Sequence, residues 1–437
     1  MGKDLNRREF VGLGAAATAG ILLGCAQQNK TYNLKPFLDQ APDGIEIKAG
    51  LVGCGGRGSG AALNFLNAGP NLKITALADI FQDKMDRCRA KLKEEKDVQV
   101  ADENCFFGFD AYKKVIDSGV NLVILATPPH FRPEHFAAAI DAKKHVFMEK
   151  PVAVDPVGAR SIMASSKKAE TLGLCVATGT QRRHQRDYLT TYKKIYEGAI
   201  GDIVSANCYW NQSQLWYVSP EKNWSEMEAM LRDWVNWSWL SGDHIVEQHV
   251  HNIDVINWFT GYKPLKAVAF GSRQRRVTGN QYDFFSVDFE YENEIRVHSM
   301  CRQINGCENN VSEYIRGTNG YSNCRNTIYN SDGSVRWTYQ YPKDEQGNAT
   351  ETVKVSPYDQ EHIDLVTAIR QNEPYTEAEQ TAFSTLTAIM GRISAYTGKE
   401  ITLDEMMQSD FSTKPDAYNL ADVNGVSKTV PVPGSES

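Results

Sequence analysis

The apolar residues of the chain follow two different patterns, one on each side of residue 178. Between residues 47 and 178, short and nearly continuous apolar runs alternate with longer charged stretches of helical period. The runs lie at residues 47–52, 74–78, 122–126, 145–148 and 174–177. Such runs are typical of strands buried on both faces of a parallel sheet. Residues 47–178 are therefore predicted to form a doubly wound α/β domain.

From residue 179 the pattern changes to an alternation of apolar and polar residues. It recurs at residues 203–210, 265–270, 284–291 and 295–301, which predicts a largely antiparallel sheet with one covered face. Helical segments at residues 361–371 and 377–397 close this second domain, which we place at residues 179–408. Residues 409–437 form a C-terminal tail, which is expected to pack poorly.

The N-terminus has the order of an export signal. Arg7 and Arg8 precede a mildly apolar run, which ends in Gly-Cys at Cys25. This order resembles a twin-arginine signal with a lipoprotein box, in which Cys25 carries the lipid. We expect residues 1–25 to be the signal, residues 26–46 to be a tether, and the protein to be an exported bacterial lipoprotein facing the periplasm. The alternative is a buried N-terminal helix with a chance arginine pair.

Composition and charge narrow the classes of function. The 437-residue chain is long enough for two domains and has a net charge of −7. This charge and the lack of a basic stripe argue against a nucleic-acid partner. No internal apolar run is long enough to span a bilayer, so we expect membrane contact only through a lipid anchor at Cys25.

Eight cysteines remain besides Cys25. Cys301, Cys307 and Cys324 are close enough in sequence to suggest one disulfide in an oxidising compartment, with the pairing left open. No C-x-x-C pair exists, and the spacing of the cysteines predicts no metal site.

The first apolar run leads into a glycine-rich turn of pattern G-x-G-x-x-G between a strand and a helix. The first glycine permits a tight turn, the second lets the backbone approach a pyrophosphate, and the third allows close helix–strand packing. The second run ends at Asp79, placed to bind ribose hydroxyls and to repel a 2′-phosphate, which favours NAD over NADP. A plain turn is the alternative. The predicted cofactor-binding residues are Gly53, Gly55, Gly56, Arg57, Gly58 and Asp79.

Three more motifs follow: Ala-Thr-Pro at residues 126–128, Glu-Lys-Pro at residues 149–151, and a later His-x-x-Asp helix. With the glycine turn, they resemble the glucose–fructose oxidoreductase, inositol dehydrogenase and MocA (Gfo/Idh/MocA) family over residues 47–401. The resemblance implies a Rossmann domain, then an α+β domain with an open, largely antiparallel sheet. It implies NAD(P) in the first domain and sugars or cyclitols at the junction. It also implies further cofactor contacts at Thr127, Pro128, Glu149 and Lys150.

Lys150 is the first candidate catalytic residue. It follows a parallel strand at its carboxyl end, where ligands bind in open α/β sheets. A lysine there can hydrogen-bond a substrate hydroxyl and take part in proton transfer, and Glu149 could hold its ammonium group. The alternative is a surface ion pair. The resemblance assigns substrate contact to Lys150.

A second candidate segment begins at Glu247. His251 matches the family's catalytic histidine, which takes a hydroxyl proton as hydride leaves the same carbon. Glu247 stands where the family has aspartate and His249 where it has glycine, so both are candidate catalytic groups, while Asp254 is a candidate substrate contact. Structural histidines are the alternative, as is a metal cluster of Glu247, His249 and His251, for which no further ligand is evident.

Other substrate contacts are predicted from aromatic and basic residues. Six of the eight tryptophans lie between residues 210 and 239. Trp216 and Trp224 could stack on sugar rings, although packing explains the tryptophans equally well. Arg182 and His184 follow the last apolar run near the junction and could hold hydroxyls or an acidic sugar, with a solvated basic turn as the alternative.

Export restricts the reaction. A free NAD(H) pool is not expected outside the cytoplasm, so the cofactor should stay bound and be recycled within each cycle. We predict an NAD-dependent oxidoreductase acting on a sugar, cyclitol or glycoside hydroxyl. One alternative is an NAD-dependent glycosidase working by oxidation, elimination, water addition and re-reduction; another is a non-catalytic glycan-binding lipoprotein. A homo-oligomer through the open sheet is a family expectation.

Overall fold

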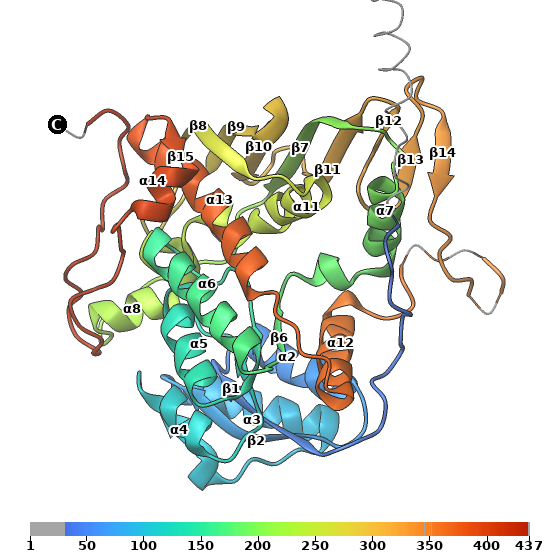
Figure 1. Ribbon diagram of the computed structural model, residues 1–437. Coiled ribbons are helices and arrows are strands. Elements are labelled where there is room, and N and C mark those ends of the chain that lie inside the picture. Colours follow the sequence, from blue (N-terminus) through green and yellow to red (C-terminus); the bar gives the residue numbers. More distant parts are fainter. Residues whose placement is uncertain (1–30, 345, 349, 351, 436–437) are drawn as a thin grey trace, which may run out of the picture.

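The computed structural model describes residues 31–344, 346–348, 350 and 352–435 (Figure 1). The predicted export signal, with Arg7, Arg8 and Cys25, lies outside the described residues. Within the described part, no helix is long and apolar enough to cross a membrane.

The N-terminal domain is built on a parallel sheet of six strands in the order β3-β2-β1-β4-β5-β6. β4 (Leu122–Leu125) is buried at every position, because helices cover both faces of the sheet. The predicted doubly wound α/β fold is confirmed. The other strands are β1 Ile47–Val52, β2 Leu72–Asp79, β3 Cys105–Phe107, β5 His145–Met148 and β6 Val176–Thr178, and the helices are α2 Gly56–Asn67, α3 Gln82–Lys96, α4 Ala111–Asp117, α5 Arg132–Asp141 and α6 Pro156–Thr171.

The second domain is built on a nine-stranded sheet in the order β14-β13-β12-β11-β7-β10-β9-β8-β15. All its neighbouring strands are antiparallel except β7 and β10, which run parallel. The predicted open, largely antiparallel sheet is confirmed. The strands are β7 Ile203–Gln212, β8 Pro264–Ser272, β9 Phe284–Tyr291, β10 Arg296–Gln303, β11 Asn310–Gly317, β12 Gly320–Ser322, β13 Thr327–Tyr329, β14 Val335–Thr338 and β15 Ile401–Thr402.

Helices cover one face of this sheet, as the alternation along the strands requires (Figure 1). Inward residues such as Val287 and Phe289 of β9 are fully buried, whereas the outward residues Val268 and Phe270 of β8 are 53% and 68% exposed. The helices of this part of the chain are α7 Arg186–Tyr196, α8 Glu226–Arg232, α9 Ser238–Ser241, α10 His244–Glu247, α11 Val250–Thr260, α12 Pro357–Gln371, α13 Ala378–Thr397 and α14 Leu403–Gln408.

One late helix belongs to the first domain. α12 lies against α2 beside the parallel sheet, and in Figure 1 it is drawn below α13. Its Ile363 and Val366 are buried in the same apolar cluster as Phe65 of α2. Asn64 of α2 also donates a 2.7 Å hydrogen bond to Asp359. The first domain is therefore completed by residues that follow most of the second.

Most residues of the C-terminal tail are exposed, as expected, but a few of them anchor it to the rest of the protein. Val423 is 1% exposed and lies in an apolar cluster with Met227 and Trp239. The Tyr418 hydroxyl lies 2.7 Å from Nε2 of His130. The tail therefore contacts both domains, because His130 belongs to the first domain and Met227 and Trp239 belong to the second.

The segment before the first strand is packed as well. Ala41 is 3% exposed and contributes to the core of the first domain. Arg186 of α7 donates a 2.9 Å hydrogen bond to Asp39. Residues 31–46 therefore lie along both domains. The role of residues 26–46 as a tether stays a prediction.

The expected disulfide is absent. All eight cysteines in the described part of the chain are free. Cys301 and Cys324 are buried in the core of the second domain, whereas Cys307 is exposed on a turn, so apolar packing accounts for the first two.

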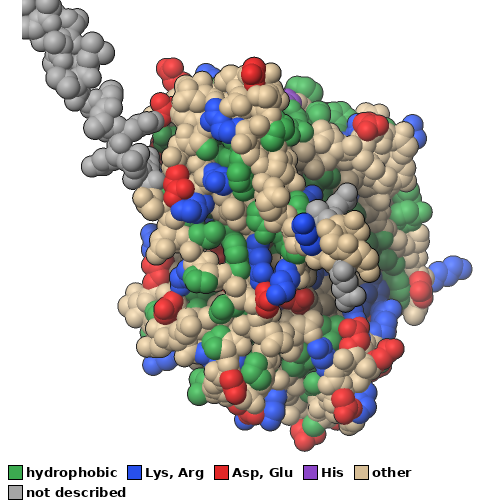
Figure 2. All heavy atoms as spheres, turned by 90° about the vertical axis from the view of Figure 1, so that its right-hand side faces the viewer, with side chains coloured by type: hydrophobic (Ala, Val, Ile, Leu, Met, Phe, Trp, Pro, Cys, Tyr) green, Lys and Arg blue, Asp and Glu red, His purple; other side chains and the backbone are tan. Residues whose placement is uncertain are grey.

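The face that carries α12 and the last strands mixes charges of both signs (Figure 2). Surface ion pairs such as Lys35–Glu373 and Lys354–Asp39 account for part of this pattern. On this face the described side chains therefore form no large surface of one sign.

Candidate active site

The glycine turn after β1 has the geometry that its pattern predicts. Gly53 has a φ of +98°, and a Cβ there would lie 2.7 Å from the Thr127 nitrogen. A Cβ on Gly58 would lie 1.8 Å from the Gly53 carbonyl oxygen. At Gly55 and Gly56, by contrast, a Cβ would meet nothing within 4 Å. The outer glycines are thus required for packing, and the middle two leave open space for a ligand.

This open space is part of a cavity of about 450 Å³ at the carboxyl edge of the parallel sheet. Trp216, Leu231 and Trp234 of the second domain also line it. Eight of the ten predicted cofactor residues lie on its walls: Gly53, Gly55, Gly56, Arg57, Gly58, Asp79, Thr127 and Pro128.

Asp79 ends β2 at the rim of the cavity. Its carboxylate accepts hydrogen bonds from the backbone N–H groups of Cys54, at 2.7 Å, and Phe81, at 2.9 Å. Burial raises the pKa of Asp79, and these backbone donors oppose that rise. Each carboxylate oxygen keeps further lone pairs for ribose hydroxyls.

Glu149 pairs with Arg57 of the glycine turn rather than with Lys150, so the expected Glu149–Lys150 contact is wrong. The guanidinium of Arg57 also lies 4.9 Å from the Tyr358 ring and 3.9 Å from Glu361 of α12. Burial and the charge of Glu149 raise the pKa of Glu361 well above its ordinary value. The glycine turn, the Glu-Lys-Pro motif and α12 are therefore tied together at one arginine.

Lys150 contacts Glu247, which lies across the domain junction. Its Nζ donates to the Glu247 backbone oxygen and, at 3.1 Å, to Oε1 of the same residue. Both side chains are about nine-tenths buried. Burial opposes the ionisation of Glu247, but Lys150 and Gln248 outweigh it, so the pKa of Glu247 is lowered. The pair is thus a lysine–carboxylate ion pair at the end of β5.

His251 lies one helical turn after Glu247 and is 8% exposed. Its ring stacks on Trp210 of β7 at 5.7 Å between centroids. Burial lowers the pKa of His251 well below its ordinary value, and the charges of Lys150 and Arg182 lower it further. The imidazole is therefore neutral at pH 7, as a proton acceptor must be.

Arg182 also lies beside Trp210. Its guanidinium donates to Glu313 and lies 5.7 Å from the Trp210 ring. The other Glu313 oxygen accepts a 3.0 Å hydrogen bond from the Tyr188 hydroxyl. His251 and Arg182 thus both contact the partly buried ring of Trp210.

His249 does not share this site. Its Nε2 lies 2.7 Å from the Ser299 hydroxyl and 3.7 Å from the Cys208 thiol, inside the core of the second domain. Burial lowers the pKa of His249 to about 3. The ring faces the sheet while His251 faces the junction, so a catalytic role for His249 finds no support in this geometry. Among the described residues, no group of three or more His, Cys, Asp or Glu side chains is arranged to hold a metal ion.

Asp254 and His184 are engaged by other side chains. Both oxygens of Asp254 accept from Arg183, at 2.8 and 2.9 Å. The ring nitrogens of His184 lie 2.7 Å from Asp364 and 3.0 Å from Glu377. Burial opposes protonation of His184, but the two carboxylates outweigh it and raise its pKa well above the ordinary value. These contacts hold the domains together and leave little for a substrate.

The two predicted platform tryptophans lie elsewhere. Trp216 is 48% exposed on the wall of the dinucleotide cavity, edge-on to Trp234 at 6.3 Å. Trp224 packs against the Arg232 guanidinium at 4.9 Å. The aromatic ring at the His251 site is Trp210.

Sequence reasoning missed two residues of this site, Trp210 and Glu313. Both are inward positions of alternating strands, where a large amphipathic ring and a carboxylate stand among apolar residues. A carboxylate on the covered face of a strand needs a buried partner. The position of Glu313 in the alternating pattern of its strand was therefore the signal by which it could have been found.

Two family descriptions match the chain. "Oxidoreductase family, NAD-binding Rossmann fold" matches residues 47–178, and "GFO/IDH/MocA C-terminal domain" matches residues 188–323. The chain belongs to the Gfo/Idh/MocA family. Its first domain is accordingly an NAD-binding Rossmann fold.

Two curated proteins illustrate the range of relatives of this Gfo/Idh/MocA chain. Scyllo-inositol 2-dehydrogenase (NADP(+)) IolW of Bacillus subtilis (strain 168) is 26% identical over 245 residues, which are 56% of this chain and 60% of the relative. 2,7-Anhydro-N-acetylneuraminate hydratase of Escherichia coli (strain K12) is 26% identical over 249 residues, 56% of this chain and 59% of the relative. The matched segment thus spans about 60% of each relative's length.

Solved structures show the same fold at low sequence identity. Scyllo-inositol dehydrogenase from Lactobacillus casei, with bound cofactor NAD(H) and scyllo-inositol, has a TM-score of 0.59 at 20% identity, over 82% of this chain and 99% of that one. An oxidoreductase domain protein from Kribbella flavida has a TM-score of 0.66 at 16% identity, over 82% and 100%.

The residues of this Gfo/Idh/MocA chain fit the family's cofactor. The N-terminus of α2 has no side-chain cap and no acidic residue in its first turn, so its N–H groups can bind a pyrophosphate. Gly55 and Gly56 leave room for the phosphates, and Asp79 lies at the ribose position.

Proposed function

We propose that this protein is an NAD(H)-dependent oxidoreductase that acts on a hydroxyl of a sugar, cyclitol or glycoside. The observation that carries the proposal is the cluster of Lys150, Glu247 and His251 at the carboxyl end of β5. It adjoins the Rossmann fold, and the inositol dehydrogenases among the relatives point to polyhydroxylated rings as substrates.

Bound NAD supplies the acceptor for the hydride. Two of the three N–H groups of Lys150 are directed at Glu247, and the third is left to bind the substrate oxygen. His251, neutral and buried, takes the hydroxyl proton as hydride leaves the same carbon, which yields a ketone. Return of that proton to the ketone oxygen accompanies re-reduction, so one histidine serves both directions.

A redox-neutral glycosidase is the second candidate. A relative named as a hydratase catalyses the addition of water and so supports a reaction without net redox change. In such a reaction the ketone acidifies the neighbouring C–H group, a base removes that proton and the aglycone leaves. Water addition and re-reduction then restore the sugar. The first and last steps use Lys150 and His251 as before.

The experiment uses the full-length protein purified without added NAD. It is incubated with glycosides and free sugars while nicotinamide absorbance and released aglycone are recorded together. Reduced cofactor that a keto-sugar later discharges supports the oxidoreductase, and aglycone release without net reduction supports the glycosidase.

Lys150→Met should lower either activity by about 10²–10⁴-fold. Lys167→Met, at a lysine whose side chain is 68% exposed on α6, is the matched control. Equal activity of the Lys150→Met and Lys167→Met variants would refute the catalytic assignment of Lys150. Failure of the wild-type protein to bind a dinucleotide would favour the non-catalytic glycan-binding lipoprotein.

We further propose that the protein is exported as a lipoprotein, binds NAD in preference to NADP, and assembles as a homo-oligomer. Export explains a cofactor that is recycled while bound. Cys25→Ser should then move the protein from the membrane fraction to the soluble fraction. Phe270, 68% exposed on the open sheet face, supports the assembly, and Phe270→Glu should lower the mass in solution.

A further inference from the structure

One wall of the dinucleotide cavity comes from the second domain. We call residues 213–243, between β7 and α10, the insert. Its side chains Trp216, Val218, Leu231, Arg232 and Trp234 line the same cavity as the glycine turn. The sequence predicted sugar binding or packing for the aromatic residues of this segment, yet four of these five side chains form an apolar wall of the cofactor cavity.

The insert is anchored beside Asp79. Arg232 donates a 3.0 Å hydrogen bond to Asp83 of α3, and its guanidinium lies 4.0 Å from the Phe81 ring. Phe81 and Asp83 directly follow Asp79, which binds the adenosine ribose in a Rossmann fold. The wall formed by the insert therefore faces the adenosine half of the cofactor.

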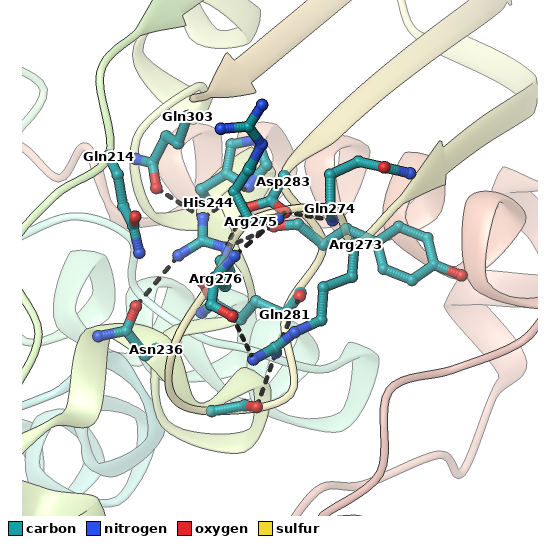
Figure 3. A network of polar contacts seen from close by, with 12 residues as sticks. Gln214, Asn236, His244, Arg273, Gln274, Arg275, Arg276, Gln281, Asp283 and Gln303 are labelled. Atoms are coloured by element: carbon teal, nitrogen blue, oxygen red, sulfur yellow. Dashed lines mark hydrogen bonds and ion pairs between the residues drawn. The ribbon is translucent and has the colours of Figure 1, made fainter. Parts of the chain in front are cut away.

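A second polar loop, residues 273–283, holds the insert from behind, and we call it the latch loop. Figure 3 shows Arg276 between Gln303 and Asn236 of the insert, to which it donates at 2.6 and 3.1 Å. Gln281 donates a 2.6 Å hydrogen bond to the backbone oxygen of Val235.

The latch loop is itself rigid. The Asp283 carboxylate accepts from the backbone N–H groups of Gln274 and Arg275, and Arg273 donates to four backbone oxygens of the loop. Gly279 touches the insert so closely that a Cβ would lie 1.8 Å from the Asn236 oxygen. The insert is thus a fixed wall, since moving it breaks a buried network.

We propose that Trp216 and Trp234 of the insert form a binding surface for the adenosine half of the cofactor. The latch loop fixes this surface, so that the dinucleotide stays bound through repeated cycles. Trp216 offers a half-exposed indole face to the cavity, and an adenine ring stacks on such a face. The proposal rests on the proposed function, because it requires that the dinucleotide stay bound between cycles. It gives a role to residues that take no part in hydride or proton transfer.

The first test separates the two halves of the cofactor. ADP-ribose and nicotinamide mononucleotide each compete with NADH for the full-length protein, followed by nicotinamide fluorescence. Trp216→Ala should weaken ADP-ribose binding about ten- to hundredfold and leave the mononucleotide unchanged. Tyr217→Ala is the matched control, because Tyr217 is 47% exposed on the same loop but does not line the cavity.

Unchanged ADP-ribose binding in Trp216→Ala, or equal weakening of both ligands, would overturn the assignment. Hydride transfer by the wild-type protein is measured in parallel. If it is absent while ADP-ribose binding still depends on Trp216, the proposed function fails and the adenosine surface stands.

The second test concerns the latch loop. Gly279→Ala should accelerate NADH release by about tenfold, because its Cβ pushes on Asn236. Gly261→Ala is the control, since Gly261 has the same φ of +68° and a Cβ there meets nothing within 4 Å. If Gly279→Ala does not fold, Gln281→Met removes the side-chain hydrogen bonds to the Val235 backbone oxygen and the Ser241 hydroxyl and should act in the same direction. Equal release rates in the variant and control would refute the latch.

Discussion

Replacing Asp254 by asparagine removes the charge from one side of a buried ion pair. Arg183 donates to both oxygens of Asp254 at 2.8 and 2.9 Å, and the two side chains are 10% and 2% exposed. A guanidinium left in such surroundings without its carboxylate costs about 3–5 kcal/mol. We therefore expect Asp254→Asn to lower the free energy of unfolding by about 3–5 kcal/mol and to leave the KM of a sugar substrate unchanged.

Urea unfolding, followed by tryptophan fluorescence and far-UV circular dichroism, measures this loss. Ser384→Ala is the control, because it removes a 2.7 Å hydrogen bond to the same carboxylate without removing a charge, and should cost about 1.5 kcal/mol. The double variant Arg183→Met, Asp254→Leu leaves no charge unpaired and should recover most of the stability.

The opposite result would have a clear meaning. A loss of less than about 1 kcal/mol in Asp254→Asn is what an ordinary surface change produces. Together with a raised KM, it would show that Asp254 contacts the substrate and that the structural reasoning is wrong.

Three other predictions follow from the site and the tail. Gly58→Ala should abolish cofactor binding, measured as dinucleotide extracted from the purified protein, because its Cβ would lie 1.8 Å from the Gly53 oxygen; a full complement would contradict this. The pKa of His251 is well below 6.5, so kcat/KM should stay constant as the pH falls to 6.5. It should decline only at lower pH, where protonation removes the base. A decline that begins already at pH 7 would refute this role of His251. Tyr418→Phe removes the contact to His130 and should lower the free energy of unfolding, measured in urea, by about 1 kcal/mol. An unchanged free energy of unfolding would show that this contact of the tail does not stabilise the protein.

The sequence was sufficient for the architecture because the determining signals are local. A short continuous apolar run such as β4 favours a strand buried on both faces, and the order of the glycines after β1 predicts a phosphate-binding turn. The covered face of the second sheet follows in the same way from the alternation of buried and exposed residues along β9.

Long-range pairing was the part that sequence could not supply. Glu149 stands next to Lys150, yet its partner is Arg57, 92 residues away, and Glu247 takes its place at Lys150. Adjacent side chains after a strand diverge, so nearness in sequence is a poor guide to ion pairs. Trp216 illustrates the same limit, because the sequence does not distinguish a tryptophan that contacts a sugar from one that contacts a nucleotide.

The position of α12 has a consequence for how the protein is made. The ribosome synthesises the Rossmann strands first. The apolar side of α2 around Phe65 stays uncovered until Ile363 and Val366 of α12 have been synthesised. Eight of the nine strands of the second sheet are synthesised in between. The nascent first domain therefore presents an unfinished surface to chaperones until the chain is almost complete, and loading of the dinucleotide becomes one of the last events of biogenesis.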